Sequence, residues 1–235
     1  MFNIIKKHKK PIKGESYIEK IKFLLKACDE IFSLQQESNI YEYVANNLHE
    51  FIGDSIIIVN SADEEFENIK IEALVGLGDK FSHITNLLGM NPLGKKYKMD
   101  ETSKKDILKF KLNRIEGGIH SLSFKTVPKN ICTLIEKAIG LKEIYGIGLV
   151  KNNIIFGSVI ILIKEDNLEM DLELLESFIK IFAIAIKSKI DEDNLNESKK
   201  DLEKINKFSV GREIEMIKLK KEIVELKNKI KDNQI

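Results

Sequence analysis

The sequence predicts an α+β fold, in which helices pack on one face of an antiparallel sheet. One observation is a pair of strand-forming runs within 144–163, on either side of Asn152-Asn153. Asparagine tolerates positive φ, so this pair suits a tight hairpin turn. A second observation is the order of the other patterns. They place two helices before two strands and lack the regular strand–helix alternation of a doubly wound sheet.

Composition restricts the classes of function. The 235 residues are 43% hydrophobic and 32% charged with a formal net charge of +1, which does not suit a binder of polyanions. Arg114 and Arg212 are the only arginines, so specific nucleic-acid recognition is not expected. Cys28 and Cys132 form no CxxC pair, and neither a membrane span nor a secretory signal is recognisable. We therefore expect a cytoplasmic protein.

The N-terminal part predicts a flexible basic tail followed by two helices. Residues 1–15 contain breakers and a lysine cluster, which is typical of a solvated tail. A capping-box pattern begins the helix 16–38, and a similar pattern at Asn39 begins a second helix, which Gly53 can end. In the first helix, the apolar residues recur every three or four positions and indicate a helix–helix seam. These residues are Ile18, Ile21, Leu25, Cys28 and Phe32.

The middle of the chain predicts two strands followed by short, irregular elements. The first strand runs over 55–60. In the second, Ile69, Ile71 and Ala73 alternate with charged residues, which indicates a half-exposed strand. The remaining expected elements are a helix that Asp79 caps, an edge strand over 95–99, a helix over 101–110 and a short strand over 119–124.

The hairpin follows a further helix. Pro128 suits the first turn of this helix, and Gly140 can end it. The second hairpin strand, 154–163, carries no charge, so it should be covered on both faces. Three glycines remove side chains from strand positions and indicate a bulge or the close approach of another segment. They are Gly146, Gly148 and Gly157.

The C-terminal part of the chain has helical patterns. Asp166 or Asp171 caps a helix to about Ile190, and 191–200 is either a joint or a continuous helical link. In 201–235, a heptad seam places isoleucine or methionine at a and leucine at d, which favours a parallel two-stranded coil. Its residues are Met216, Leu219, Ile223, Leu226 and Ile230.

Charges beside this seam agree with a parallel pair. Glu215 at g can meet Lys220 at e of a partner, and Glu222 can meet Lys227. The alternative is an amphipathic helix that folds back on its own domain.

From Asn39 to about Ile190, the chain resembles a GAF domain, a small-molecule sensor module related to PAS. The resemblance lies in the element order, in the terminal amphipathic helix, and in the strand pair with its run Phe156-Gly157-Ser158-Val159-Ile160. The runs 127–148 and 206–213 also look like GAF-containing sensory proteins of methanogenic archaea.

The resemblance implies that the end helices pack on one side of the sheet and that 79–125 covers a ligand pocket on the other. An Asn-Lys-Phe-Asp-Glu run and a bilin-attaching cysteine–histidine pair are both missing, so neither cyclic nucleotides nor bilins are expected. The expected domains are a tail (1–15), an N-terminal helix (16–38), a GAF-like domain (39–190) and a coiled-coil helix (191–235).

Candidate site residues follow from this arrangement. The apolar ones can line the pocket or plug the sheet face: Phe81, Ile84, Leu88, Phe110 and Phe124. His83 and His120 can ligate haem or a metal ion or bind an anionic ligand, but no second ligand stands at a recognisable spacing, which favours an ordinary surface or hydrogen-bonded histidine. Cys132 is either a thiol nucleophile or a small core residue. Cys28 is either a packing residue of the N-terminal seam or the site of a redox crosslink.

The sequence predicts a sensory or regulatory module rather than an enzyme, because it shows no nucleophile–base–acid set, phosphate loop or kinase motif. A small molecule or a redox change would act at the pocket, and the sequence does not identify a cofactor. The end helices of a homodimer would relay the change to a histidine kinase or other partner in trans, or to an output domain outside this chain. Two alternatives remain: an enzyme like free methionine sulfoxide reductases, with Cys132 as nucleophile, and a ligand-free dimerisation scaffold.

Overall fold

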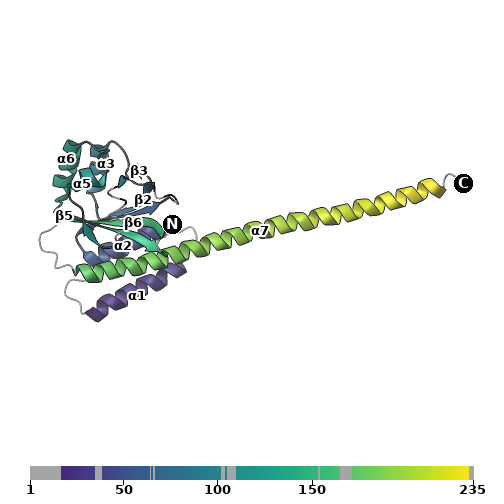
Figure 1. Ribbon diagram of the computed structural model, residues 1–235, viewed down its shortest axis with the longest axis horizontal. Coiled ribbons are helices and arrows are strands. Elements are labelled where there is room, and N and C mark those ends of the chain that lie inside the picture. Colours follow the sequence, from purple (N-terminus) through teal and green to yellow (C-terminus); the bar gives the residue numbers. More distant parts are fainter. Residues whose placement is uncertain are drawn as a thin grey trace. The chain divides into compact units, whose positions relative to one another are not determined.

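An antiparallel sheet forms the centre of the structure (Figure 1). The computed structural model describes residues 17–34, 39–63, 65, 67–101, 104, 110–152, 154–164 and 171–232, with only the backbone in 224–232. The sheet has six strands in the order β3-β2-β1-β6-β5-β4. They are β1 (Ser55–Ala62), β2 (Asn68–Val75), β3 (Lys96–Lys98), β4 (Asn113–Arg114), β5 (Glu143–Lys151) and β6 (Ile154–Ile163). The predicted α+β class is confirmed.

Helices cover both faces of the sheet (Figure 1). The longer helices pack on one face, as predicted: α1 (Tyr17–Ser33), α2 (Ile40–Ile52) and the beginning of α7 (Leu172–Asp232). The shorter helices lie over the other face: α3 (Lys80–Leu88), α5 (Gly118–Leu122) and α6 (Lys129–Ile139). This second layer is formed by the segment that was expected to cover a pocket, together with α6.

Side chains cap α2 and α7 where the sequence predicts, whereas Asp79 precedes α3 without making the predicted side-chain capping hydrogen bond. The Asn39 side chain accepts hydrogen bonds from the N–H groups at the beginning of α2, and Gly53 follows its last turn. Gly140 ends α6 in the left-handed conformation, with φ at 70°, which costs glycine little. Of the two acidic candidates for α7, Asp171 is the one that caps it, since its Oδ1 accepts from the N–H of Leu174 at 3.0 Å.

The core between the sheet and the longer helices is built from aromatic and aliphatic side chains. The ring centroids of Phe51 and Phe178 lie 4.4 Å apart, and those of Phe23 and Phe51 lie 6.2 Å apart. These rings connect α1, α2 and α7. Below them, Ile57 and Val59 of β1 are fully buried, so this layer holds the beginning of α7 against the sheet.

The structure differs from the expected strands at two places. Residues 119–124 do not form a strand; they lie in and directly after α5. Glu136 Oε1 accepts from the N–H of Ile119 at 2.7 Å, so a carboxylate on α6 satisfies the beginning of this short helix. A neighbour this distant in sequence leaves no local signal. The very short β4, which pairs with β5, was not expected. Most of the helix expected over 101–110 lies outside the described residues.

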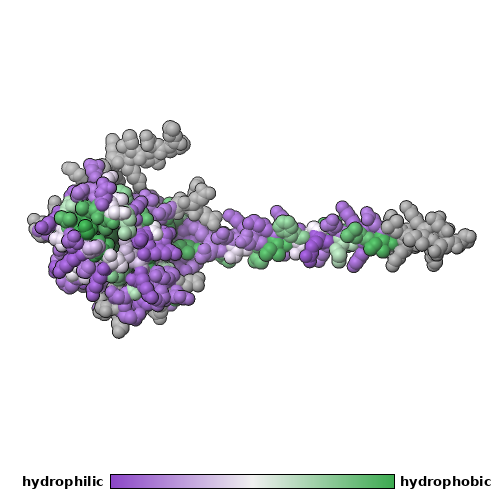
Figure 2. All heavy atoms as spheres, turned by 90° about the horizontal axis from the view of Figure 1, so that it is seen from above, coloured by the Kyte–Doolittle hydropathy of each residue, from purple (hydrophilic) through white to green (hydrophobic). Residues whose placement is uncertain are grey.

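The chain divides into two units, Met1–Lys189 and Ile190–Ile235. Residues 191–200 are helical, so the link between the last two helical patterns is part of α7. In the second unit, apolar side chains recur along the helix and are exposed (Figure 2). No helix in the described part of the chain has an apolar stretch that would let it span a membrane.

Candidate functional site

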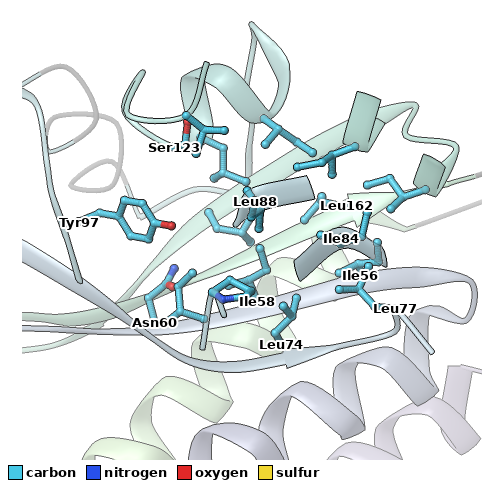
Figure 3. A pocket seen from close by; sticks show the side chains of 18 of the residues that line it. Ile56, Ile58, Asn60, Leu74, Leu77, Ile84, Leu88, Tyr97, Ser123 and Leu162 are labelled. Carbon is cyan, nitrogen blue, oxygen red and sulfur yellow. The ribbon is translucent and has the colours of Figure 1, made fainter. Parts of the chain in front are cut away.

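A cavity of about 120 Å³ lies between the sheet and the short helices α3, α5 and α6 (Figure 3). Apolar side chains also gather at one place on the outside of this face (Figure 2). The cavity is lined from the strands by Ile56, Ile58, Asn60, Ile69, Ile71, Leu74, Tyr97, Ile160 and Leu162, and from the other elements by Leu77, Ile84, Leu88, Pro92, Ile119, Leu122, Ser123, Val127, Ile135 and Ile139. None of these carries a charge.

Strand register determines which side chains reach the cavity. Asn60 of β1 lies opposite Ser158 of β6, and alternate residues beyond this pair face the same way, so the even-numbered residues of both strands point to the cavity. In β2 the register shifts between the partners of Val59 and Asn60, which marks a bulge.

The bulge corrects one expectation from the sequence. Ile71 pairs with Asn60 on the cavity face, whereas Ala73 pairs with Val59 on the helix face. The three alternating apolar residues of β2 therefore do not share one face, and Leu74 lines the cavity instead. An extra residue in one strand reverses the alternation beyond it, and the sequence pattern does not show where this happens.

Asn60 is the main polar group of the cavity. Its Nδ2 donates to Ser158 Oγ at 2.9 Å, and its side-chain oxygen Oδ1 has no hydrogen-bond partner among the described residues. The residue is only 3% exposed. Tyr97 and Ser123 are the other polar lining residues, and burial raises the pKa of the Tyr97 phenol. In Figure 3, all three lie at one end of the view, whereas Ile56, Leu77 and Leu162 lie at the other.

Glycines in the hairpin allow close packing around this site. A Cβ on Gly157 would lie 2.2 Å from the carbonyl oxygen of Asn60, so β6 can approach β1 here only without a side chain. A Cβ on Gly146 would lie 2.8 Å from Cδ1 of Ile115. The close approach that the sequence predicts is therefore confirmed at these two glycines.

The fold is shared with several solved structures, although no family model and no curated protein matches the sequence. The GAF domain of a phosphoenolpyruvate-protein phosphotransferase from Acinetobacter superimposes with a TM-score of 0.53 at 13% identity, over 77% of this chain and 97% of that one. The corresponding domain from Coxiella burnetii gives 0.54 at 14%, over 78% and 99%. The chain has a GAF-like fold.

A phycoerythrobilin-bound GAF domain from a cyanobacterial phytochrome is also similar, with a TM-score of 0.52 at 11% identity, over 74% of this chain and 96% of that one. At sequence identities this low, the similarity shows a shared fold. The resemblance to proteins of methanogenic archaea stays a prediction.

The GAF-like fold brings only some of the predicted pocket residues to the cavity. Ile84 and Leu88 line it, because they share the inner face of α3. The other four predicted residues are half-buried and are not among the described lining residues: Phe81, Phe110, His120 and Phe124. Phe124 packs against the ring of Tyr97 from outside, with centroids 6.4 Å apart.

The histidines have ordinary roles or surroundings. Nδ1 of His120 lies 2.9 Å from the carbonyl oxygen of Val127, which positions the loop before α6. His83 is exposed on α3. Among the residues that the structure describes, no group of His, Cys, Asp and Glu side chains is arranged to hold a metal ion.

Cys132 is a buried residue of α6 and does not line the cavity among the described residues. It is 1% exposed, and its Sγ donates to the carbonyl oxygen of Val127 at 3.6 Å. Burial, and then the charge of Glu136, raise the pKa of this thiol. A buried thiol with a raised pKa is poorly suited to nucleophilic attack, because the thiolate is the reactive form. Cys28 is half-buried on α1, and burial and Asp29 raise the pKa of its thiol.

Sequence reasoning did not find Asn60 and Tyr97. A signal for Asn60 was present, since it is a polar residue in an apolar strand. Its orientation depends on pairing with Ser158, a residue distant in sequence. Tyr97 lies on β3 opposite Ile69, and only sheet formation brings it to the cavity.

Proposed function

We propose that this protein is a sensory or regulatory module, in which a small molecule in the cavity changes the packing of paired terminal helices. The observation that carries the proposal is the arrangement in the first unit. The sheet separates a cavity on one face from α1 and the beginning of α7 on the other. The output is a histidine kinase or another signalling partner in trans, and we place the protein in the cytoplasm.

Helix α1 offers an apolar face beyond the one that it buries. Leu24, Ala27 and Ile31 are buried in the first unit. Ile18 and Leu25 of the predicted seam are 64% and 56% exposed. Large apolar side chains at heptad spacing on an exposed face favour a second helix as their cover.

The second unit supports a second copy of this chain as the partner. Met216, Leu219 and Ile223 are each more than half exposed at a and d positions of one register. Glu215 and Lys220 occupy the g and e positions beside this seam, where they would meet across a parallel pair. Each such exposed ion pair contributes about 0.2–1 kcal/mol, so these charges would select register and orientation more than they stabilise.

A short connection links the cavity side to α7. The N–H of Ile115 donates to the carbonyl oxygen of Ile144 at 2.8 Å, and both residues belong to the apolar core beside the cavity. Three residues earlier, the N–H of Leu112 donates to Glu176 of α7 at 2.9 Å. A ligand that shifts this core would therefore act on α7 through β4, provided that it binds two helix arrangements unequally.

Redox input remains part of the proposal through Cys28, which occupies a seam position of α1. No observation at Cys132 favours the alternative of a methionine sulfoxide reductase-like enzyme, because this thiol is buried and its pKa is raised. A ligand-free scaffold would have a sheet face that side chains fill completely. The cavity on this face disfavours that alternative.

The seam can be tested with two matched substitutions two residues apart on α7. Leu219 and Ile217 are 52% and 55% exposed, but only Leu219 lies in the seam. Sedimentation equilibrium should show a dimer for the wild-type chain and for Ile217→Lys. Leu219→Lys should weaken the dimer by at least about tenfold, because each copy would bury an unpaired charge. A wild-type monomer at micromolar concentration, or equal behaviour of the two variants, would contradict the proposal.

A further inference from the structure

The cavity beside the sheet is surrounded almost entirely by hydrocarbon. All but three of its described lining residues are aliphatic residues or proline, and they come from the sheet, the short helices and the loops between them (Figure 3). Protein interiors are closely packed, so a space of about 120 Å³ leaves many lining atoms without contacts. An apolar molecule in this space would supply those contacts.

The polar lining residues offer few hydrogen bonds to a molecule in the cavity. Asn60 Nδ2 already donates to Ser158 Oγ, and the Asn60 side-chain oxygen is buried, so a molecule in the cavity does not reach it. Ser123 Oγ donates to the carbonyl oxygen of His120 at 3.0 Å. A buried water needs two to four polar partners. The cavity therefore favours an apolar occupant over water.

Charge and covalent attachment are both disfavoured at this site. The described lining residues include no Asp, Glu, Lys, Arg or His, so a charged ligand would lose its hydration without gaining a counter-charge. Tyr97 is the remaining polar lining residue, and burial raises the pKa of its phenol, which keeps the hydroxyl neutral at pH 7. The described lining residues include no cysteine, so they offer no thiol for a covalent chromophore.

The size of the cavity limits the ligand to about one ring. Its volume of about 120 Å³ is of the same order as the ~150 Å³ of an apolar cavity in another protein that accepts benzene. Ile84 of α3 and Ile135 of α6 are buried and line the cavity opposite Ile160 of β6. A ligand of this size would therefore contact two of the short helices and the sheet at once.

We propose that the cavity binds an uncharged hydrocarbon-like molecule of about the size of benzene, which is selected by apolar contact and by the exclusion of charge. The proposal rests on the proposed sensory function and specifies the chemical class that is sensed.

Calorimetric titration of the full chain with three molecules of similar shape tests this class. Toluene is uncharged, benzoate carries a negative charge and benzylammonium carries a positive charge. Toluene should bind, and each charged molecule should bind at least about tenfold more weakly, because the lining supplies no counter-charge. No binding of toluene up to its solubility limit would overturn the proposal, and so would a charged molecule that binds as tightly as toluene.

Two matched leucine substitutions identify the site. Leu88 lines the cavity, whereas Leu134 of α6 is 50% exposed and is not among the described lining residues. Leu88→Phe places a larger side chain in the cavity and should weaken toluene binding at least about tenfold, whereas Leu134→Phe should leave it unchanged. Circular dichroism shows whether each variant is folded. If folded Leu88→Phe binds toluene as well as the wild type does, the ligand lies elsewhere and the proposal fails.

The alkylation rate of Cys28 and the dimer affinity separate this proposal from the sensory function itself. If toluene binds as expected and neither property changes, the ligand class stands and the relay fails. If toluene does not bind, but a charged molecule binds and changes either property, the class is wrong and the sensory function stands.

Discussion

Replacing Asn60 by Leu together with Ser158 by Ala should make the ligand-free protein more stable. A buried oxygen without a partner costs about 1–3 kcal/mol, and the hydrogen bond between these two side chains contributes only about 0.5–1.5 kcal/mol. The double variant removes both contributions and adds apolar surface next to the cavity. We expect its free energy of unfolding to rise by about 1–2 kcal/mol.

Urea unfolding at a fixed protein concentration measures this change, since the stability of an oligomer depends on concentration. The melting temperature should rise by about 2–4 °C for each kcal/mol. Ser158→Ala alone is the matched control. It leaves the Asn60 amide without its acceptor, so it should lower stability by about 1–2 kcal/mol. A double variant less stable than the wild type would refute the reasoning, because it would mean that the oxygen is satisfied in solution without a ligand.

Three further predictions concern packing elsewhere in the first unit. Gly157→Ala should lower the free energy of unfolding by at least about 2 kcal/mol, because the new Cβ would lie 2.2 Å from a backbone oxygen of β1. Urea titrations measure this change, and a decrease below about 0.5 kcal/mol would contradict the geometry. The Lys180 side chain, and then the N–H of Leu112, lower the pKa of Glu176. This carboxylate therefore stabilises the folded protein above its unfolded pKa, and the contribution is lost as the pH falls through the folded pKa. In a plot of the free energy of unfolding against pH, Glu176→Gln should make the decrease between about pH 5 and 3 less steep. Cys132 should resist alkylation at pH 7 in the folded protein while the other cysteine reacts, and rapid modification by iodoacetamide would revive thiol chemistry.

Local signals predict most of the secondary structure correctly. The cap at Asn39, the glycine ends of α2 and α6 and the hairpin strands all agree with the structure, since each depends on residues close in sequence. The strand expected over 119–124 is wrong, because a carboxylate on the next helix satisfies the beginning of α5. Ala73 is misplaced for a related reason, since a bulge depends on the partner strand.

The candidate site is harder to predict than the fold. Ile84 and Leu88 are found because helical spacing places both on one face. Asn60 and Tyr97 are missed, because each reaches the cavity only after strands distant in sequence have paired. The aromatic candidates Phe81 and Phe124 show that apolar character alone does not tell a lining residue from one that packs behind it.

By itself, the amino-acid sequence determined the fold class, the two terminal helices and the heptad pattern of the last one, since periodicity and capping act over a few neighbouring residues. Only the tertiary structure decided that a cavity exists, which side chains line it and that the Asn60 amide oxygen has no partner within the described part of the chain. Those properties depend on how side chains distant in sequence fill a shared volume, and no pattern along the chain records the space that they leave.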